Sequence, residues 1–190
     1  MPNRPVILPG SPTDAPIVSC TPFWTGRRKR LYGAVGLATG LFVASSLLRD
    51  WRDSHTLLIN TSPSLPNWAF VLDRTHPPAR GSLVFFAPPV SPLVVRHFGA
   101  HPAAFGKLVY GVGGDTVSRI GRTYFVNGRE VAVAKAVSIR GEPLALGPTG
   151  IIPRGCYFVG TPHKDGFDSR YAAIGWICMS RVFGTGTAIL

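Results

Sequence analysis

Two short segments of this sequence carry residues that could act together as a nucleophile and its base. Ser64 lies in Asn60-Thr-Ser-Pro-Ser-Leu-Pro66, where two prolines restrict the backbone on either side of the serine. Lys107 lies in the otherwise apolar Phe105-Gly-Lys-Leu-Val-Tyr110. Burial disfavours the ammonium form of a lysine, so a lysine in such a strand can act as a base near neutral pH. A rigidly held serine with a neutral lysine as its general base could carry out acyl transfer.

A third segment, Asp165-Gly-Phe-Asp-Ser-Arg-Tyr171, could support this pair. Asp168 and Arg170 are expected to form a structural ion pair that fixes a loop under the site. His163 lies nearby, and a Ser-His-Asp triad of Ser64, His163 and Asp168 is the main mechanistic alternative. Taken singly, the three segments also fit a plain Ser/Pro turn, an exposed edge-strand lysine and a polar turn.

No motif in the sequence indicates a metal or cofactor site. The sequence contains no HExxH, no GxSxG and no glycine-rich phosphate loop between a strand and a helix. Its three cysteines, Cys20, Cys156 and Cys178, have neither CxxC nor His-paired spacing, so we predict no metal site and no cofactor. Cys156 and Cys178 lie in apolar, strand-like runs, which favours buried free thiols over a disulfide between them.

One apolar run is long enough to cross a membrane. Residues 31–48 carry no charge and would span about 27 Å as a helix, which matches a bilayer core. Four cations, Arg27, Arg28, Lys29 and Arg30, precede the run, whereas its other flank carries two charges of each sign. The positive-inside rule then predicts a cytoplasmic N-terminus and export of everything after residue 50. A cleavable signal peptide and a buried core helix are the alternatives.

The parts on either side of this run differ in composition. Residues 1–30 are proline-rich and basic, and we expect a disordered cytoplasmic tail. Residues 51–190 alternate short extended runs with Pro and Gly, and Asn127-Gly128 gives a strong hairpin signal. We therefore predict a mostly β domain, with at most one short helix within 91–105. The formal charge is +11, but basic residues outside the 27–30 block are scattered singly, which argues against a nucleic-acid partner.

Taken in order, the segments resemble the S26 signal-peptidase family. Asn60-Thr-Ser-Pro-Ser-Leu-Pro66 is similar to the box in which the last serine is the nucleophile, which indicates Ser64 rather than Ser62. Lys107-Leu-Val-Tyr-Gly-Val-Gly-Gly-Asp115 resembles the box that carries the base. Further similar boxes are Phe125-Val-Asn-Gly128, Ile152-Pro-Arg-Gly-Cys-Tyr-Phe-Val-Gly160 and Phe167-Asp-Ser-Arg-Tyr171.

The resemblance implies a signal-peptidase-like β-fold catalytic domain after one transmembrane helix, with a Ser64–Lys107 dyad. It also implies an oxyanion hole formed by the Ser64 N–H and the Ser62 hydroxyl, and a supporting role for Asp168 and Arg170. Within the family the boxes are most similar to conjugative-transfer peptidases of the TraF type. Those act on an exported pilin precursor, which they can cyclise, in pilus biogenesis or type IV secretion.

The expected location is therefore the bacterial inner membrane, in contact with its lipid, with a periplasmic catalytic domain. Nothing in the pattern indicates an oligomeric state. A general type I signal peptidase, a catalytically inactive relative serving as a membrane assembly factor, and a basic envelope protein remain as alternatives.

Several positions depart from the family pattern. Asn67-Trp68 changes the turn after the nucleophile, Leu108 replaces a common arginine, and Ala172-Ala173-Ile174 inserts residues before Gly175. Gly166 stands where many relatives carry a serine whose hydroxyl orients the lysine, so the residue with that role is not evident from the sequence.

Overall fold

The computed structural model describes residues 25–60 and 65–189. Ser62 and Ser64, Cys20, and nearly all of the tail predicted over residues 1–30 lie outside these described residues. The chain divides into two units, Met1–Leu47 and Leu48–Leu190, which are considered separately.

A single long helix, α1 (Gly26–Ser54), contains the predicted membrane segment. It is the one helix of the described chain that is long and apolar enough to cross a membrane. It extends past both ends of the predicted 31–48 run, so the basic block 27–30, expected in the tail, forms its first turn. Arg and Lys are good helix formers, which explains this extension. None of its residues is buried, which contradicts the alternative of a helix in the protein core.

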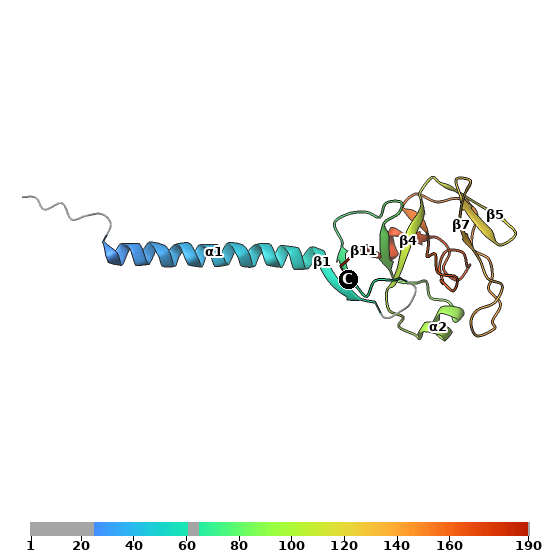
Figure 1. Ribbon diagram of the computed structural model, residues 1–190, viewed down its shortest axis with the longest axis horizontal. Coiled ribbons are helices and arrows are strands. Elements are labelled where there is room, and N and C mark those ends of the chain that lie inside the picture. The colour runs from blue at the N-terminus through green and yellow to red at the C-terminus, as the bar shows by residue number, and fades with distance from the viewer. Residues whose placement is uncertain (1–24, 61–64, 190) are drawn as a thin grey trace, which may run out of the picture. The chain divides into compact units, whose positions relative to one another are not determined.

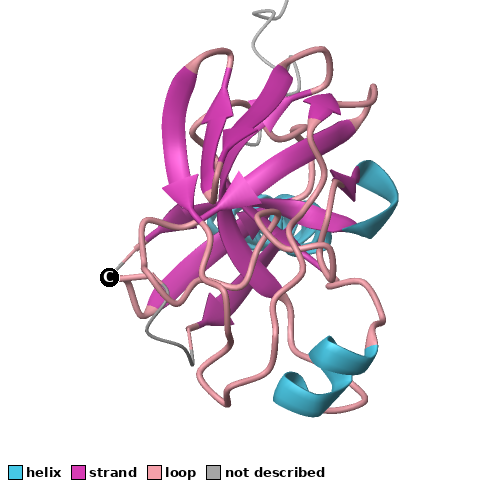
Figure 2. Cartoon of the chain, turned by 90° about the vertical axis from the view of Figure 1, so that its right-hand side faces the viewer, coloured by secondary structure: helices cyan, strands magenta, loops and turns pink. Residues whose placement is uncertain are grey.

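The second unit is built mainly from two antiparallel sheets (Figures 1 and 2). The larger has seven strands in the order β1-β2-β11-β3-β4-β9-β10. Their bounds are β1 His55–Ile59, β2 Ala69–Asp73, β3 Leu83–Phe86, β4 Phe105–Val112, β9 Cys156–Gly160, β10 Ile177–Cys178 and β11 Val182–Ala188. Strand β4 is an inner strand that pairs with both β3 and β9.

The smaller sheet has four strands in the order β7-β6-β5-β8. Their bounds are β5 Thr116–Ile120, β6 Thr123–Val126, β7 Arg129–Val133 and β8 Gly150–Ile151. Strands β6 and β7 form the predicted hairpin, and its turn residues Asn127 and Gly128 have φ of 49° and 79°. Two consecutive positive φ values are what a two-residue type I′ turn requires, which explains the Asn-Gly pair. The predicted mostly β fold is confirmed.

The domain also contains one short α-helix, as predicted within residues 91–105. Helix α2 (Pro92–Phe98) begins after Ser91, whose hydroxyl accepts a hydrogen bond from the Val94 N–H at 3.2 Å. A proline in the first turn and a serine cap are typical of a helix start. A single 3₁₀ turn, η1 (Met179–Arg181), precedes β11.

The hydrophobic core around β4 surrounds the predicted base. Val84, Val109 and Val159, from β3, β4 and β9, belong to one cluster of buried side chains together with Phe86 and Ile177. Lys107 lies two residues before Val109 on β4 and opposite Val84 on β3, next to this cluster.

The cysteine prediction is wrong. Cys156 and Cys178 form a disulfide between β9 and β10, where they stand directly opposite each other. The two residues are 22 positions apart. Their apolar local surroundings fit a free thiol equally well, and only the pairing of the two strands brings the sulfur atoms together.

Candidate active site

Lys107 is buried in the middle of the larger sheet. The residue is 5% exposed, and it faces Val84 across the pairing of β4 with β3. The alternative of an exposed edge-strand lysine is therefore wrong, because β4 has a partner strand on each side. No ion pair of Lys107 occurs within the described part of the chain, and its Nζ lies 5.9 Å from the centre of the Phe105 ring.

This burial changes the acidity of the lysine. Desolvation is the main cause that lowers the pKa of Lys107 below its usual 10.5. The negative charge of Asp168 raises the pKa and the positive charge of Arg170 lowers it, so the two charges oppose each other and desolvation decides the direction. A larger neutral fraction near neutral pH is the property that a general base requires.

The ends of the serine segment are held together beside this lysine. Asn60 donates from its Nδ2 to the carbonyl oxygens of Leu65 and Asn67, at 3.0 and 2.8 Å. Its backbone N–H donates to the Trp68 oxygen at 2.8 Å. These bonds hold together the described residues on either side of the 61–64 segment, between β1 and β2.

One contact links this loop to the strand of the lysine. A Cβ atom placed on Gly106 would lie 3.0 Å from Leu65 Cδ1 and 2.8 Å from Phe85 Cε1. The residue that follows Ser64 in the chain thus packs against the residue that precedes Lys107. Gly106 allows this approach because it has no side chain.

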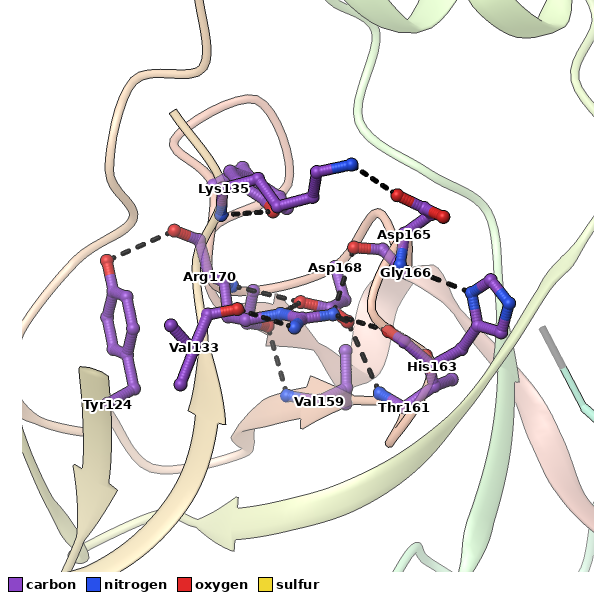
Figure 3. A network of polar contacts seen from close by, with 12 residues as sticks. Tyr124, Val133, Lys135, Val159, Thr161, His163, Asp165, Gly166, Asp168 and Arg170 are labelled. Atoms are coloured by element: carbon purple, nitrogen blue, oxygen red, sulfur yellow. Dashed lines mark hydrogen bonds and ion pairs between the residues drawn. The ribbon is translucent and has the colours of Figure 1, made fainter. Parts of the chain in front are cut away.

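The predicted ion pair of Asp168 and Arg170 is confirmed, and it is almost completely buried (Figure 3). Arg170 Nε donates to Asp168 Oδ1 at 2.8 Å, and Nη2 donates to Oδ2 at 2.7 Å. The same guanidinium donates to the carbonyl oxygens of Val133 and Gly166, at 2.9 and 3.0 Å. Asp168 Oδ2 also accepts the Thr161 N–H at 3.2 Å. The pair thus ties the end of β9 to β7 and to the 163–166 loop.

The link between Asp168 and His163 that the alternative triad needs is absent from the described residues. Both carboxylate oxygens of Asp168 are bound by Arg170, and no hydrogen bond joins them to the His163 ring in the described residues. The His163 Nδ1 instead accepts the Asp165 N–H at 3.2 Å. Asp168 is therefore not positioned to orient His163 as a triad requires.

Gly166 has no room for a side chain. A Cβ atom there would collide with Thr161 Oγ1, and it would stand 2.7 Å from Arg170 Nη2 and 3.0 Å from Asp168 Oδ2. The Thr161 hydroxyl thus occupies the space at this position. Thr161 was not among the residues predicted from the sequence, because a threonine after an apolar strand carries no signal that distinguishes it.

Comparisons with known proteins show the family of the chain. The family model "Signal peptidase, peptidase S26" matches residues 29–190. Among solved structures, a signal peptidase I from Enterococcus faecalis V583 is 24% identical, covering 58% of this chain and 97% of its own, with a TM-score of 0.38. No curated protein matches the chain. Because the family match extends over most of the sequence, this chain belongs to the S26 family of signal peptidases.

Proposed function

We propose that the chain is a membrane-anchored serine endopeptidase in which Lys107 is the general base for Ser64. The observation that carries the proposal is the buried Lys107, whose pKa desolvation lowers, on an inner strand of the sheet. The contact of Leu65 with Gly106 supports it, because it joins the two segments at the residues next to Ser64 and Lys107.

The reaction follows from the chemistry of these groups. Neutral Lys107 accepts the proton of the Ser64 hydroxyl while the oxygen attacks the scissile carbonyl carbon. The Ser64 N–H and the Ser62 hydroxyl donate to the developing oxyanion. The Lys107 ammonium then gives its proton to the leaving amine, and an acyl-enzyme remains. Asp168 and Arg170 stabilise the loop beside the base and take no part in proton transfer.

The catalytic domain is placed on the exported side of a bacterial inner membrane, in contact with its lipid. Helix α1 serves as the anchor, and its basic N-terminal turn keeps that end in the cytoplasm. The Cys156–Cys178 disulfide supports this location, because disulfides persist in oxidising compartments such as the bacterial periplasm.

The substrate is an exported precursor protein, and the TraF-like box around Ser64 favours a pilin precursor of a conjugative or related type IV secretion system. In such a reaction the amino group of the pilin itself can resolve the acyl-enzyme and give a cyclic subunit. No nucleic acid takes part.

The test uses the full chain in detergent micelles with a pilin precursor and, in parallel, a quenched fluorescent peptide. The peptide carries an apolar stretch followed by an Ala-x-Ala site, the cleavage pattern of secretory signals. Ser64→Ala and Lys107→Ala should each abolish cleavage, whereas His163→Ala should retain it. Loss of activity in His163→Ala with retention in Lys107→Ala would favour the triad, and an inactive wild-type chain would favour an assembly factor.

Mass spectrometry distinguishes the possible products. A pilin product lighter than the linear cleaved chain by one water molecule indicates cyclisation. Cleavage of the peptide but not of the pilin precursor would instead indicate a general type I signal peptidase.

A further inference from the structure

Thr161, the residue after β9, has a buried hydroxyl with no hydrogen-bond partner. The residue is 1% exposed, and across residues 25–60 and 65–189 its Oγ1 is the one buried side-chain polar atom without a partner. Leaving such a group unpaired costs about 1–3 kcal/mol. A valine has nearly the same shape and would avoid this cost. A function of the hydroxyl would explain why a threonine stands at this position.

Thr161 directly follows the pair of Leu108 and Gly160, the last in the printed register of β4 with β9 on the Lys107 side. In the antiparallel pair of β4 and β9, Val109 stands opposite Val159 and Leu108 opposite Gly160. Continued by one residue past the end of β9, this register would bring Lys107 opposite Thr161. Directly opposite residues project from the same face of a sheet.

The two side chains also belong to the closer type of cross-strand pair. The Val109 N–H donates to Ser82 O at 2.9 Å, and the Val159 N–H donates to Ser169 Oγ at 3.0 Å. Both donors therefore point away from the β4–β9 interface. The N–H of Thr161, two residues after Val159, also points away from this interface, because it donates to Asp168 Oδ2. In pairs of this type the Cα atoms are about 4.5 Å apart and the side chains approach most closely.

Gly166 lies on the other side of this hydroxyl. Thr161 Oγ1 occupies the space that a Cβ atom of residue 166 would need. The sequence analysis noted that many relatives carry a serine where this chain has Gly166, so the hydroxyl that orients the lysine was missing from that position. The structure contains a hydroxyl at that place, but it comes from Thr161.

We propose that Thr161 is a positioning residue whose hydroxyl oxygen accepts a hydrogen bond from Lys107 Nζ. A neutral amine has two N–H groups and one lone pair, so fixing one N–H restricts the directions in which the lone pair can point. Rotation of the two side chains would form this bond and leave the lone pair free to accept a proton. After proton transfer the ammonium keeps the same hydrogen bond. This inference rests on the proposed Ser64–Lys107 mechanism.

The central test is Thr161→Val, which removes the hydroxyl but keeps the shape of the side chain. With the quenched fluorescent peptide, kcat should fall about 10- to 100-fold, part of the range that a general base contributes, while KM stays within about twofold. The thermal unfolding midpoint should move by no more than a few degrees, because a single hydrogen bond contributes about 1 kcal/mol to stability. Thr161→Ser keeps the hydroxyl and should retain kcat within about threefold.

A rescue experiment moves the hydroxyl to the facing residue. Thr161→Ala should lose activity as Thr161→Val does. The double variant Thr161→Ala, Gly166→Ser should regain part of it, because a Cβ atom at position 166 still lies 2.7 Å from Arg170 Nη2. Gly166→Ser alone should be impaired, since its Cβ atom would collide with the Thr161 hydroxyl. A merely structural role for Thr161 would not produce this pattern.

A measurement without substrate separates this inference from the proposed function. In ¹⁵N-lysine NMR of the full chain, the Lys107 Nζ resonance should move in Thr161→Val and stay near the wild-type position in Thr161→Ser. If Thr161→Val changes neither kcat nor this resonance while Lys107→Ala abolishes cleavage, the positioning role is wrong and the dyad stands. If Lys107→Ala retains cleavage, the proposed function itself is wrong.

Discussion

Lys107 and Lys135 lie in different surroundings, although both interact with the segment 165–170. Lys107 is buried on an inner strand and has no ion pair among the described residues. The charges of Asp168 and Arg170 act on its pKa in opposite directions. Lys135 is a surface residue whose side chain is 42% exposed and whose Nζ is paired with the Asp165 carboxylate.

The surroundings of Lys107 suit a general base, whereas those of Lys135 suit a structural ion pair. An ion pair at the surface contributes little to stability. Burial without a partner favours the neutral amine and makes it available as a base. The same contrast applies to two arginine–aspartate pairs, the buried Arg170–Asp168 and the exposed Arg80–Asp115.

Replacing the two lysines in turn gives the largest expected effect. Lys107→Ala should reduce kcat/KM for the precursor at least about 10²- to 10⁴-fold, the usual contribution of a general base. Lys135→Ala removes a surface ion pair and should leave kcat/KM within about twofold. Equal losses in both variants, measured by peptide cleavage at saturating and limiting substrate, would contradict the contrast between the two lysines.

Replacing the two arginines tests the same contrast in stability. Arg170→Met leaves Asp168 as an unpaired buried charge and should lower the free energy of unfolding by about 3–5 kcal/mol. Arg80→Met should cost less than about 1 kcal/mol, because Asp115 keeps its bonds from the Val112 N–H and Asn127. Urea unfolding followed by tryptophan fluorescence measures both, and a similar loss in the two variants would be evidence against the role of burial.

Gly106→Ala tests the contact that joins the buried lysine to the serine loop. The added methyl group would press on Phe85 and Leu65, and overpacking of this kind costs about 1–3 kcal/mol. Gly186→Ala in β11 is the control. Its added methyl group would press on the same Phe85 ring and on Leu83, and Leu65 is not among its three nearest neighbours. We expect the two variants to lose similar amounts of stability, and Gly106→Ala to lose more kcat. Identical kcat values would mean that the contact of Leu65 with Gly106 does not matter for catalysis.

The smallest expected effect is on the pH dependence. The pKa of Lys107 is lowered by burial, so kcat/KM should rise with pH through that lowered pKa and then level off. Between the lowered pKa and 10.5 the unfolded state binds more protons than the folded state, so stability also rises with pH in this window.

Matched variants isolate this dependence. Urea unfolding at a series of pH values measures how the free energy of unfolding rises with pH. Lys107→Met should make this rise smaller, and Lys135→Met should leave it unchanged. A kcat/KM that falls as pH rises from neutral would be incompatible with a neutral Lys107 as the base.

The sequence by itself determined the elements that depend on local pattern. The uncharged run 31–48 predicted helix α1, and the Asn127-Gly128 turn predicted the β6–β7 hairpin, since period and turn chemistry act over a few residues. The ion pair expected between Asp168 and Arg170, which lie in one short segment, is also present in the structure. The order of the boxes along the chain was likewise enough to indicate the S26 family.

Tertiary structure alone decided how these elements meet. That β4 is an inner strand, that Cys156 pairs with Cys178, and that Leu65 reaches Gly106 all depend on contacts between residues distant in the sequence. The burial of Lys107 and the unpaired Thr161 hydroxyl follow from the same pairing of β4 with β9. Local patterns specify strands and turns, but the environment of a side chain is fixed only when strands pair and a core closes around it.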